Sequence, residues 1–193
     1  MIRAYATGLK AFAHPVFLRW YWEMNHLGHH SECGAGQNPD GFVAAWKHIW
    51  TIFAQTGAAN VAFVWCPGGS RNTAPFYPGD HYVDWIGDDH FDDQGEPTTG
   101  TAAVDNVFGA FYKQWSSHGL PMMIGATGAK PSDQAGYLQG LRVALPKGYP
   151  AVKALVYFDA AGDNGKGPWN LQGSGVAAFK ELAADPYFSV GRH

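Results

Sequence analysis

The feature that most constrains the fold of this chain is an alternation of continuously apolar strands with amphipathic helices. The predicted strands are residues 15–22, 61–65, 83–87, 121–125 and 152–158, and the predicted helices are residues 2–13, 42–55, 102–117, 133–144 and 174–184. Because the strands do not alternate between apolar and polar residues, we expect both of their faces to be buried. The pattern predicts an α/β fold in which helices cover a parallel sheet.

The loops that follow the strands are long and polar, whereas those that follow the helices are short. In parallel α/β folds the functional groups lie at the carboxyl ends of the strands. Glu23 follows the first strand in the run Trp-Tyr-Trp-Glu-Met-Asn. Bulky apolar neighbours are expected to raise the pKa of such a carboxyl, which suits a general acid. A salt bridge to Arg19 or a helix cap is the structural alternative for this glutamate.

Composition excludes several function classes. Thirteen Lys and Arg residues against 16 Asp and Glu residues give a net charge of −3, which argues against a nucleic-acid-binding module. No apolar run approaches the roughly 18 residues of a membrane span, and no signal-peptide pattern stands at Met1. Charged residues make up only 15% of the chain and aromatic residues another 15%, a balance that fits either a large aromatic core or rings that stack on sugars.

The aromatic residues divide by their place in the pattern. Trp46, Trp50 and Phe53 share one helical stripe and are expected to lie in the core. Trp22, Trp65 and Trp169 stand at the carboxyl ends of predicted strands, where an indole can stack on a pyranose ring. Structural packing is the alternative for these three.

Five segments carry longer motifs, in the order PVFLRWYWEMN, NVAFVWCPG, YPGDHYVDWIG, PMMIGATGA and VKALVYFD. Together they resemble glycoside hydrolase family 26, which contains β-mannanases and related β-glycanases on a (β/α)8 TIM barrel. The resemblance begins at the fourth barrel strand, and 193 residues fall short of the roughly 250 of a whole barrel. It therefore implies a single incomplete TIM-barrel-like domain over residues 1–193, with five parallel strands and the first three β/α units absent.

The resemblance implies a retaining double displacement by two carboxyl groups. Glu23 matches the acid/base of the family, but Ala126 stands where the family has its nucleophilic glutamate. Because a methyl group cannot attack the anomeric carbon, we expect the chain to be inactive or severely impaired as a hydrolase. The alanine fits either an engineered substitution or a natural loss of the site. A non-catalytic half-barrel that binds β-glycan or serves in an assembly is the alternative function.

The resemblance also implies a cleft that takes a β-linked polysaccharide or oligosaccharide, without a cofactor. The residues assigned to substrate binding are Trp22, Asn25, Trp65, Asp89, Phe91, Asp159 and Trp169. Phe91 replaces a tyrosine that often bonds the nucleophile in the family, and Trp22 replaces a histidine common in mannanases, so the glycan stays open. Because polysaccharide hydrolases act outside the cell, we expect a secreted protein.

Two clusters suggest metal sites but lack the required spacing. The set His26, His29, His30 and Cys33 does not follow a zinc-finger pattern. The acidic run over residues 88–96 lacks the spacing of a calcium-binding EF-hand loop. We therefore expect no metal, and a disulfide between Cys33 and Cys66 if the protein is exported, with two buried thiols as the alternative.

Five parallel strands that do not close into a barrel leave two unpaired edges. These edges are predicted at residues 15–22 and 152–158. Open apolar edges promote association between chains, so we expect the protein to be oligomeric.

Overall fold

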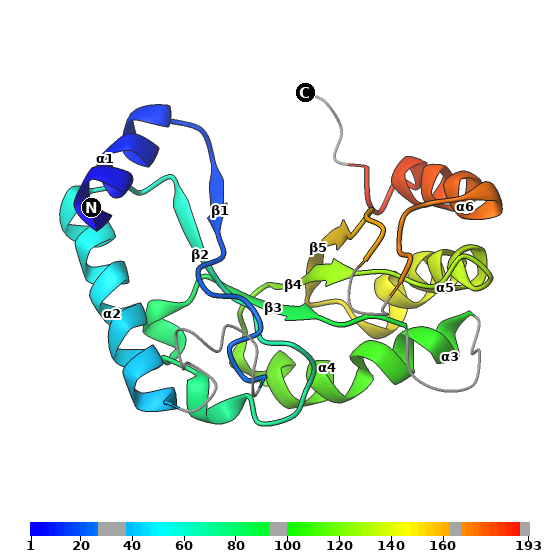
Figure 1. Cartoon of the computed structure of the whole chain (residues 1–193), viewed down its shortest axis with the longest axis horizontal. Coiled ribbons are helices and arrows are strands. Elements are labelled where there is room, and N and C mark those ends of the chain that lie inside the picture. Colours follow the sequence, from blue (N-terminus) through cyan, green and yellow to red (C-terminus); the bar gives the residue numbers. More distant parts are fainter. Residues whose placement is uncertain (27–37, 93–99, 163–166, 190–193) are drawn as a thin grey trace. The chain divides into compact units, whose positions relative to one another are not determined.

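The structure is a computed structural model of the chain, and it describes residues 1–26, 38–92, 100–162 and 167–189 (Figure 1). Helices and strands alternate along the chain, with the order α1 (Ile2–Phe12), β1 (Val16–Leu18), α2 (Pro39–Thr56), β2 (Val61–Trp65), β3 (Trp85–Asp89), α3 (Thr101–Val104), α4 (Ala110–Trp115), β4 (Met122–Thr127), α5 (Gln134–Gly148), β5 (Val152–Tyr157) and α6 (Gly173–Ala184). Short 3₁₀ turns at Ala74–Phe76, Asp80–Tyr82 and Ser116–His118 complete the described secondary structure, with a π-helical turn at Asp105–Gly109. None of the described helices is both long enough and apolar enough to cross a membrane.

The sheet has its five strands in chain order, from β1 to β5. The pairings of β1 with β2, of β2 with β3 and of β4 with β5 are all parallel. A strand–helix alternation with parallel neighbours in chain order is the arrangement of a (β/α) barrel. The α/β architecture predicted from the apolar strands is therefore the one observed.

The chain forms two compact units. The first comprises Met1–Gly87 together with His118–Pro121, and the second comprises Asp88–Ser117 together with Met122–His193. The boundary falls inside β3, so this strand contributes residues to both units.

The core of the first unit lies between α2 and the strand β2. Asn38 caps α2 by accepting a hydrogen bond from the backbone N–H of Gly41 at 2.9 Å, and the helix ends at Gly57 with a left-handed φ of 71°. Trp46 and Phe53 are buried against Phe63 of β2, which confirms their predicted place in the core.

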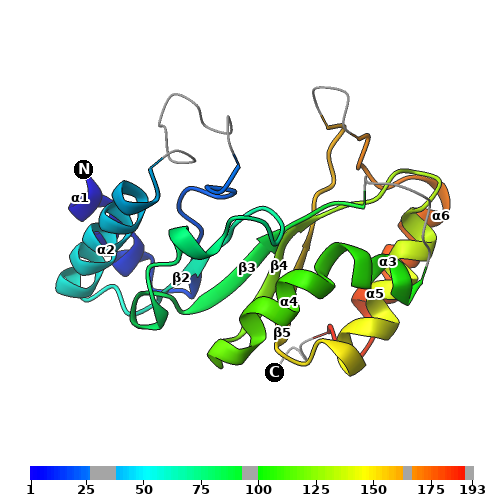
Figure 2. The same ribbon diagram turned by 90° about the horizontal axis from the view of Figure 1, so that it is seen from below.

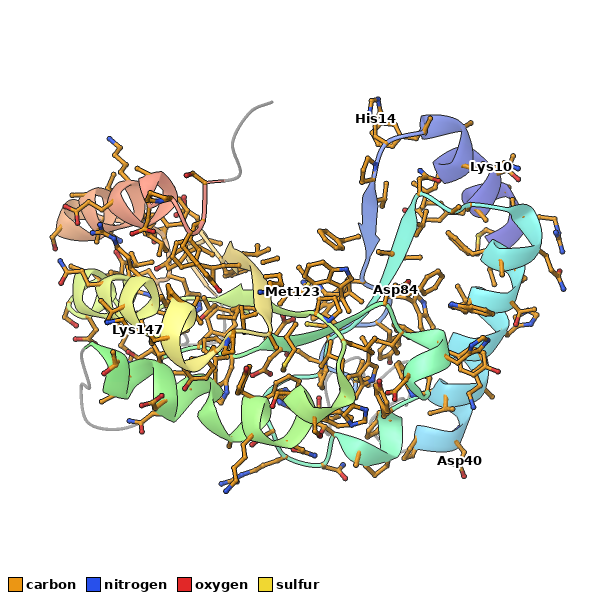
Figure 3. All side chains as sticks on the ribbon, turned by 180° about the vertical axis from the view of Figure 1, so that it is seen from behind. Lys10, His14, Asp40, Asp84, Met123 and Lys147 are labelled. Atoms are coloured by element: carbon orange, nitrogen blue, oxygen red, sulfur yellow. The ribbon has the colours of Figure 1, made fainter. Side chains whose placement is uncertain are left out.

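Helix α1 packs beside α2 in the same unit (Figure 2). Lys10, on the last turn of α1, donates a hydrogen bond from Nζ to the carbonyl oxygen of Thr56 at 3.0 Å (Figure 3). A positive charge at the end of α2 suits the negative end of its dipole. Trp50 of α2 is only half-buried, with its ring against His81 and Tyr82.

The core of the second unit is built around β4, whose six residues are all buried. Helices α5 and α6 lie side by side in Figures 1 and 2. On the outside of this pair, Arg142 of α5 donates from Nε to Asp185 at 2.8 Å, beside a weaker contact with Glu181 of α6 at 3.5 Å. The predicted helix 133–144 is confirmed, and the structure extends it to residue 148.

The predicted helix over residues 102–117 is divided by the π-helical turn at Asp105–Gly109. Such a turn accommodates one residue more than an α-helical turn. Its neighbouring residues Val107 and Phe108 are both buried. Both side chains therefore belong to the core of the second unit.

Two expectations for the outer strands are wrong. Strand β1 ends at Leu18 rather than at residue 22, because Tyr21 and Glu23 adopt left-handed backbone angles with φ of 55° and 53° that no strand can contain. The faces of β1 and β5 are not both buried, since Phe17 is 52% and Val156 is 47% exposed. Each of these strands has a partner on one side only within the described sheet, so its side chains gain less cover than those of β4.

Candidate functional site

The turn after β1 carries the candidate acid, and backbone bonds fix it to the end of β2. The N–H of Glu23 donates to the carbonyl oxygen of Cys66 at 2.9 Å, and the N–H of His26 donates to the carbonyl oxygen of Glu23 at 3.1 Å. Cys66 directly follows β2. Glu23 therefore lies at the carboxyl ends of β1 and β2, the edge at which the sequence predicted functional groups.

Asn25 connects this turn to the loop after β2. Its Nδ2 donates to the carbonyl oxygens of Gly68 and Arg71, both at 2.8 Å, and its Oδ1 accepts from the N–H of Gly68 at 2.8 Å. The side chain is only 5% exposed. Its amide therefore holds the two loops together, and its predicted place in the substrate cleft stays a prediction.

The side chain of Glu23 lies beside that of His26. The atoms Glu23 Oε2 and His26 Nδ1 are 3.5 Å apart, and the glutamate side chain is 16% exposed whereas that of the histidine is 47% exposed. On the opposite side of the ring, His26 Nε2 is 2.9 Å from the carbonyl oxygen of Gly68. The sequence singled out His26 only as part of a set without zinc-finger spacing, and the structure places it beside the candidate acid.

The two tryptophans of the first unit differ in exposure. Trp22, directly before Glu23, is 41% exposed, and its predicted contact with a sugar stays a prediction. Trp65 is fully buried, with its Nε1 donating to the carbonyl oxygen of Phe76 at 2.9 Å and Tyr77 packed edge-on at 4.9 Å. The stacking role predicted for Trp65 is not supported, because no face of its ring reaches the surface.

In the second unit, the candidate residues Asp89 and Ala126 lie at the ends of β3 and β4. The N–H of His90 donates to the carbonyl oxygen of Ala126 at 3.0 Å, and the N–H of Asp92 donates to that of Gly128 at 2.9 Å. Asp89, at the end of β3, is 4% exposed. These bonds align the carboxyl ends of the two strands, so that Asp89 and Ala126 belong to the same edge of the sheet.

Ala126 is itself 8% exposed, and its neighbour Thr127 shares a 2.6 Å hydrogen bond with the hydroxyl of Tyr137 on α5. Burial raises the pKa of this tyrosine well above its ordinary value, so its hydroxyl stays protonated. The bond ties the residue after Ala126 to α5, and the match of Ala126 to the family nucleophile stays a prediction.

Phe91 and Trp169 form an aromatic pair with ring centroids 4.9 Å apart. Gly128 lies against both, since a Cβ at this position would come within 3.2 Å of Trp169 and 3.3 Å of Phe91. Trp169 is only 4% exposed, so the structure shows it as a packed residue in this unit. The sugar-stacking role predicted for Trp169 therefore has no open ring face to support it.

Gln134, at the start of α5, holds the loop that carries Trp169. Its Nε2 lies 3.3 Å from the carbonyl oxygens of Ala129 and Trp169 and 3.0 Å from that of Asn170, and its Oε1 accepts from the N–H of Gln172 at 3.1 Å. The side chain is completely buried. Sequence reasoning missed this residue, because a glutamine at a helix start carries no sign that its amide will bond four backbone groups.

Asp159 follows β5 and accepts a hydrogen bond from the N–H of Leu171 at 2.7 Å. Its carboxylate therefore supports the loop after β5, and its predicted contact with substrate stays a prediction. Among the described residues no group of three or more His, Cys, Asp or Glu side chains could hold a metal ion.

Part of the predicted metal and disulfide chemistry falls on residues that the structure does not describe. His29, His30, Cys33 and residues 93–96 lie outside the described ranges. The other candidate cysteine, Cys66, is 1% exposed, and its Sγ is 3.7 Å from Nη1 of Arg19. The disulfide between Cys33 and Cys66 stays a prediction.

Comparison with known proteins agrees with the family that the sequence motifs resemble. The family model for glycosyl hydrolase family 26 matches residues 2–119. Endoglucanase H of Acetivibrio thermocellus is 26% identical over 193 residues, which cover 91% of this chain and 21% of that protein. A beta-1,3-xylanase of a Vibrio species is 29% identical over 123 residues, which cover 60% of this chain and 24% of that protein.

Solved structures share the fold. A GH26 beta-mannanase from Bacteroides ovatus has a TM-score of 0.65 at 15% identity, and the match covers 100% of this chain and 62% of that chain. A modular endo-beta-1,4-mannanase from Cellulomonas fimi has a TM-score of 0.64 at 18% identity, covering 96% of this chain and 46% of that one. The prediction of a partial (β/α)8 barrel with five parallel strands is confirmed, and the chain spans less than two thirds of each of these relatives.

Proposed function

The chain belongs to glycosyl hydrolase family 26, and from this premise we propose that it is a β-glycan-directed protein whose hydrolytic double displacement is blocked at Ala126. Glu23 is the acid/base in this proposal. The observation that carries the proposal is what stands at two strand ends. Glu23, with its carboxyl group, follows β1, whereas Ala126, with only a methyl group, lies near the end of β4.

The proposed block follows from the bonds that a retaining mechanism must make. The acid protonates the glycosidic oxygen while a carboxylate attacks the anomeric carbon, so that one C–O bond breaks as another forms. Alanine supplies neither the electron pair for the new bond nor a negative charge beside the oxocarbenium-like transition state. Loss of one member of such a catalytic pair commonly lowers the rate by about three orders of magnitude or more.

The proposed substrate class is a β-linked polysaccharide or oligosaccharide. The relatives are named as an endoglucanase, beta-1,3-xylanases and beta-mannanases, so we propose a panel of mixed-linkage β-glucan, β-1,3-xylan and β-mannan. Trp22 is the exposed ring that we assign to sugar contact. The chemistry of two carboxyl groups needs no cofactor, and a polysaccharide substrate favours a secreted protein.

The test restores the missing carboxyl group. Ala126→Glu is expected to raise hydrolysis of at least one glycan of the panel by about 10³-fold or more. Ala126→Gln is the matched control, because it has the same size but no nucleophilic carboxylate, and it should stay inactive. If the Ala126→Glu protein folds but hydrolyses no member of the panel, the proposal that Ala126 blocks a hydrolase is wrong.

A second candidate function is a β-glycan-binding module without catalysis. The observation that favours it is again Ala126, since a site without a nucleophile holds its ligand intact. Calorimetric titration of the unaltered chain with oligosaccharides from the same panel tests this function. Binding without turnover supports the module, and no heat with any of these sugars contradicts it.

A further inference from the structure

The imidazole of His26 lies between the Glu23 carboxyl group and the loop after β2. One ring nitrogen, Nε2, is 2.9 Å from the carbonyl oxygen of Gly68, and the other, Nδ1, is 3.5 Å from Glu23 Oε2. The first distance is that of a hydrogen bond, and the second is that of an ion pair. Both contacts join groups of the first unit only.

These contacts restrict where the protons can be. A carbonyl oxygen only accepts hydrogen bonds, so Nε2 must carry the hydrogen that faces Gly68. Nδ1 is then the atom turned toward Glu23. If neither Nδ1 nor the carboxyl group held a proton, a nitrogen lone pair would face a negative oxygen. One proton removes this repulsion, either on the imidazole beside a carboxylate or on the carboxyl group beside a neutral imidazole.

We propose that Glu23 and His26 hold one proton between them, and that His26 is a positioning residue which sets the pH at which this pair loses it. The proposal deepens the proposed function, because it rests on Glu23 as the acid/base. The more exposed imidazole exchanges protons with water, while the less exposed carboxylate gains a positive neighbour. The pair therefore stays loaded with an acid proton to higher pH than a glutamate alone.

Two further charged residues, Arg19 and Arg71, lie on the segments that pack against this turn. Arg19 lies against the Sγ atom of Cys66, with Nη1 at 3.7 Å. Arg71 joins the packing through its carbonyl oxygen, which accepts from Asn25, and its side chain is exposed. His26 lies 3.5 Å from the Glu23 carboxylate, and the charge of an imidazole changes near neutral pH, whereas that of an arginine does not.

Gly68 makes the close approach possible. A Cβ at this position would lie 2.6 Å from Cε1 and 2.8 Å from Nε2 of His26, and 3.1 Å from Cγ of Glu23. Any side chain here would push the imidazole off the carbonyl oxygen and away from the carboxyl group. The Gly68→Ala variant therefore keeps both Glu23 and His26 and disturbs only the close contact between their side chains.

The direct test follows the His26 ring nitrogens of the full chain by long-range nitrogen–proton NMR during a pH titration. In Glu23→Gln the titration midpoint of His26 is expected to fall by about one pH unit, because the negative neighbour is lost. Gly68→Ala should shift it in the same direction. His48, exposed on α2 and not part of this contact, serves as the internal reference. A His26 midpoint that is equal in the wild type and in folded Glu23→Gln would overturn the proposal.

A second readout uses activity in the Ala126→Glu background. His26→Gln keeps an amide N–H for Gly68 but cannot take up a proton, so the alkaline limb of the pH–rate profile should move to lower pH. An unchanged limb in an active variant contradicts the proposal. If Ala126→Glu shows no hydrolysis, the proposed function fails, and the NMR titration still decides whether the proton is shared.

Discussion

At the scale of single residues, two polar side chains of the turn after β1 have different surroundings. Asn25 spends its amide on three backbone groups of the loop after β2, whereas Glu23, two residues earlier, keeps its carboxyl group near His26. The turn that carries the proposed acid is thus fixed to the loop after β2 by the amide of Asn25. Positioning of this kind is what a catalytic geometry requires of its surroundings.

The role of Asn25 predicts a stability effect. Asn25→Ala leaves Gly68 N–H and two carbonyl oxygens without their partner in a buried place, and each such loss costs about 1–3 kcal/mol. We expect the free energy of unfolding to fall by about 2–4 kcal/mol in urea denaturation, allowing for partial relaxation. Gln139→Ala, an exposed amide on α5, is the control and should be nearly neutral. A neutral Asn25→Ala would contradict the bonding described.

The two strand-end tryptophans of the first unit predict separable effects. Trp22→Ala should weaken binding of the glycan panel and leave the free energy of unfolding almost unchanged, because the ring is 41% exposed. Trp65→Ala empties a fully buried site and should cost about 3–5 kcal/mol. Calorimetric titration and denaturation of both variants distinguish the two. Equal losses of stability would show that Trp22 is also a core residue.

At the scale of elements, the inner strands could be predicted to within a few residues, because unbroken apolar runs leave few alternatives. Strand β1 could not, since Trp20, Tyr21 and Trp22 continue the apolar run while the backbone already turns. The direction of the Trp65 side chain could not be predicted either. A strand that is buried on both faces has no polar residues to show which of its side chains reach the surface. Glu23 at a strand end was predictable, and the bonding of Gln134 was not.

The contacts of Asp80 with Tyr77 and His118 predict that the stability of the fold depends on pH. Asp80 accepts from the hydroxyl of Tyr77 at 2.6 Å and lies 2.7 Å from Nδ1 of His118, and these bonds hold the pKa of its carboxyl below 3.8. A lowered folded pKa adds stability above the unfolded value, and this stability disappears as the pH falls through the folded value. Asp80 is largely exposed, so the effect is small.

The stability difference between the wild type and Asp80→Asn is therefore expected to be largest near neutral pH and to shrink below about pH 4. Urea denaturation at a series of pH values measures it. Tyr77→Phe removes the hydrogen bond from the tyrosine hydroxyl to Asp80 and should reduce the same pH dependence. A difference that grows toward acid pH would have the wrong sign for this carboxylate.

At the scale of the whole molecule, the two end strands of the described sheet are β1 and β5. Each of them pairs with a neighbouring strand on one side only. Phe17 on β1 is 52% exposed, Val156 on β5 is 47% exposed, and Phe158 just beyond β5 is 43% exposed. Beside β5, a hollow of about 390 Å³ is lined by residues such as Leu155, Leu182 and Tyr187. Natural sheets usually cover or charge such edges, and β5 does carry the exposed Lys153, but the three exposed side chains named above are apolar.

We therefore expect the chain to self-associate, with a sedimentation coefficient that rises with concentration. A charge placed on an edge should oppose this association, because a lysine there would have to lose its water in the interface. Phe17→Lys combined with Val156→Lys should shift the protein toward the monomer. Val143→Lys is the matched control, since Val143 is 49% exposed on helix α5, away from any strand edge. A wild-type chain that sediments as a sharp monomer at every concentration would show that these edges do not drive assembly.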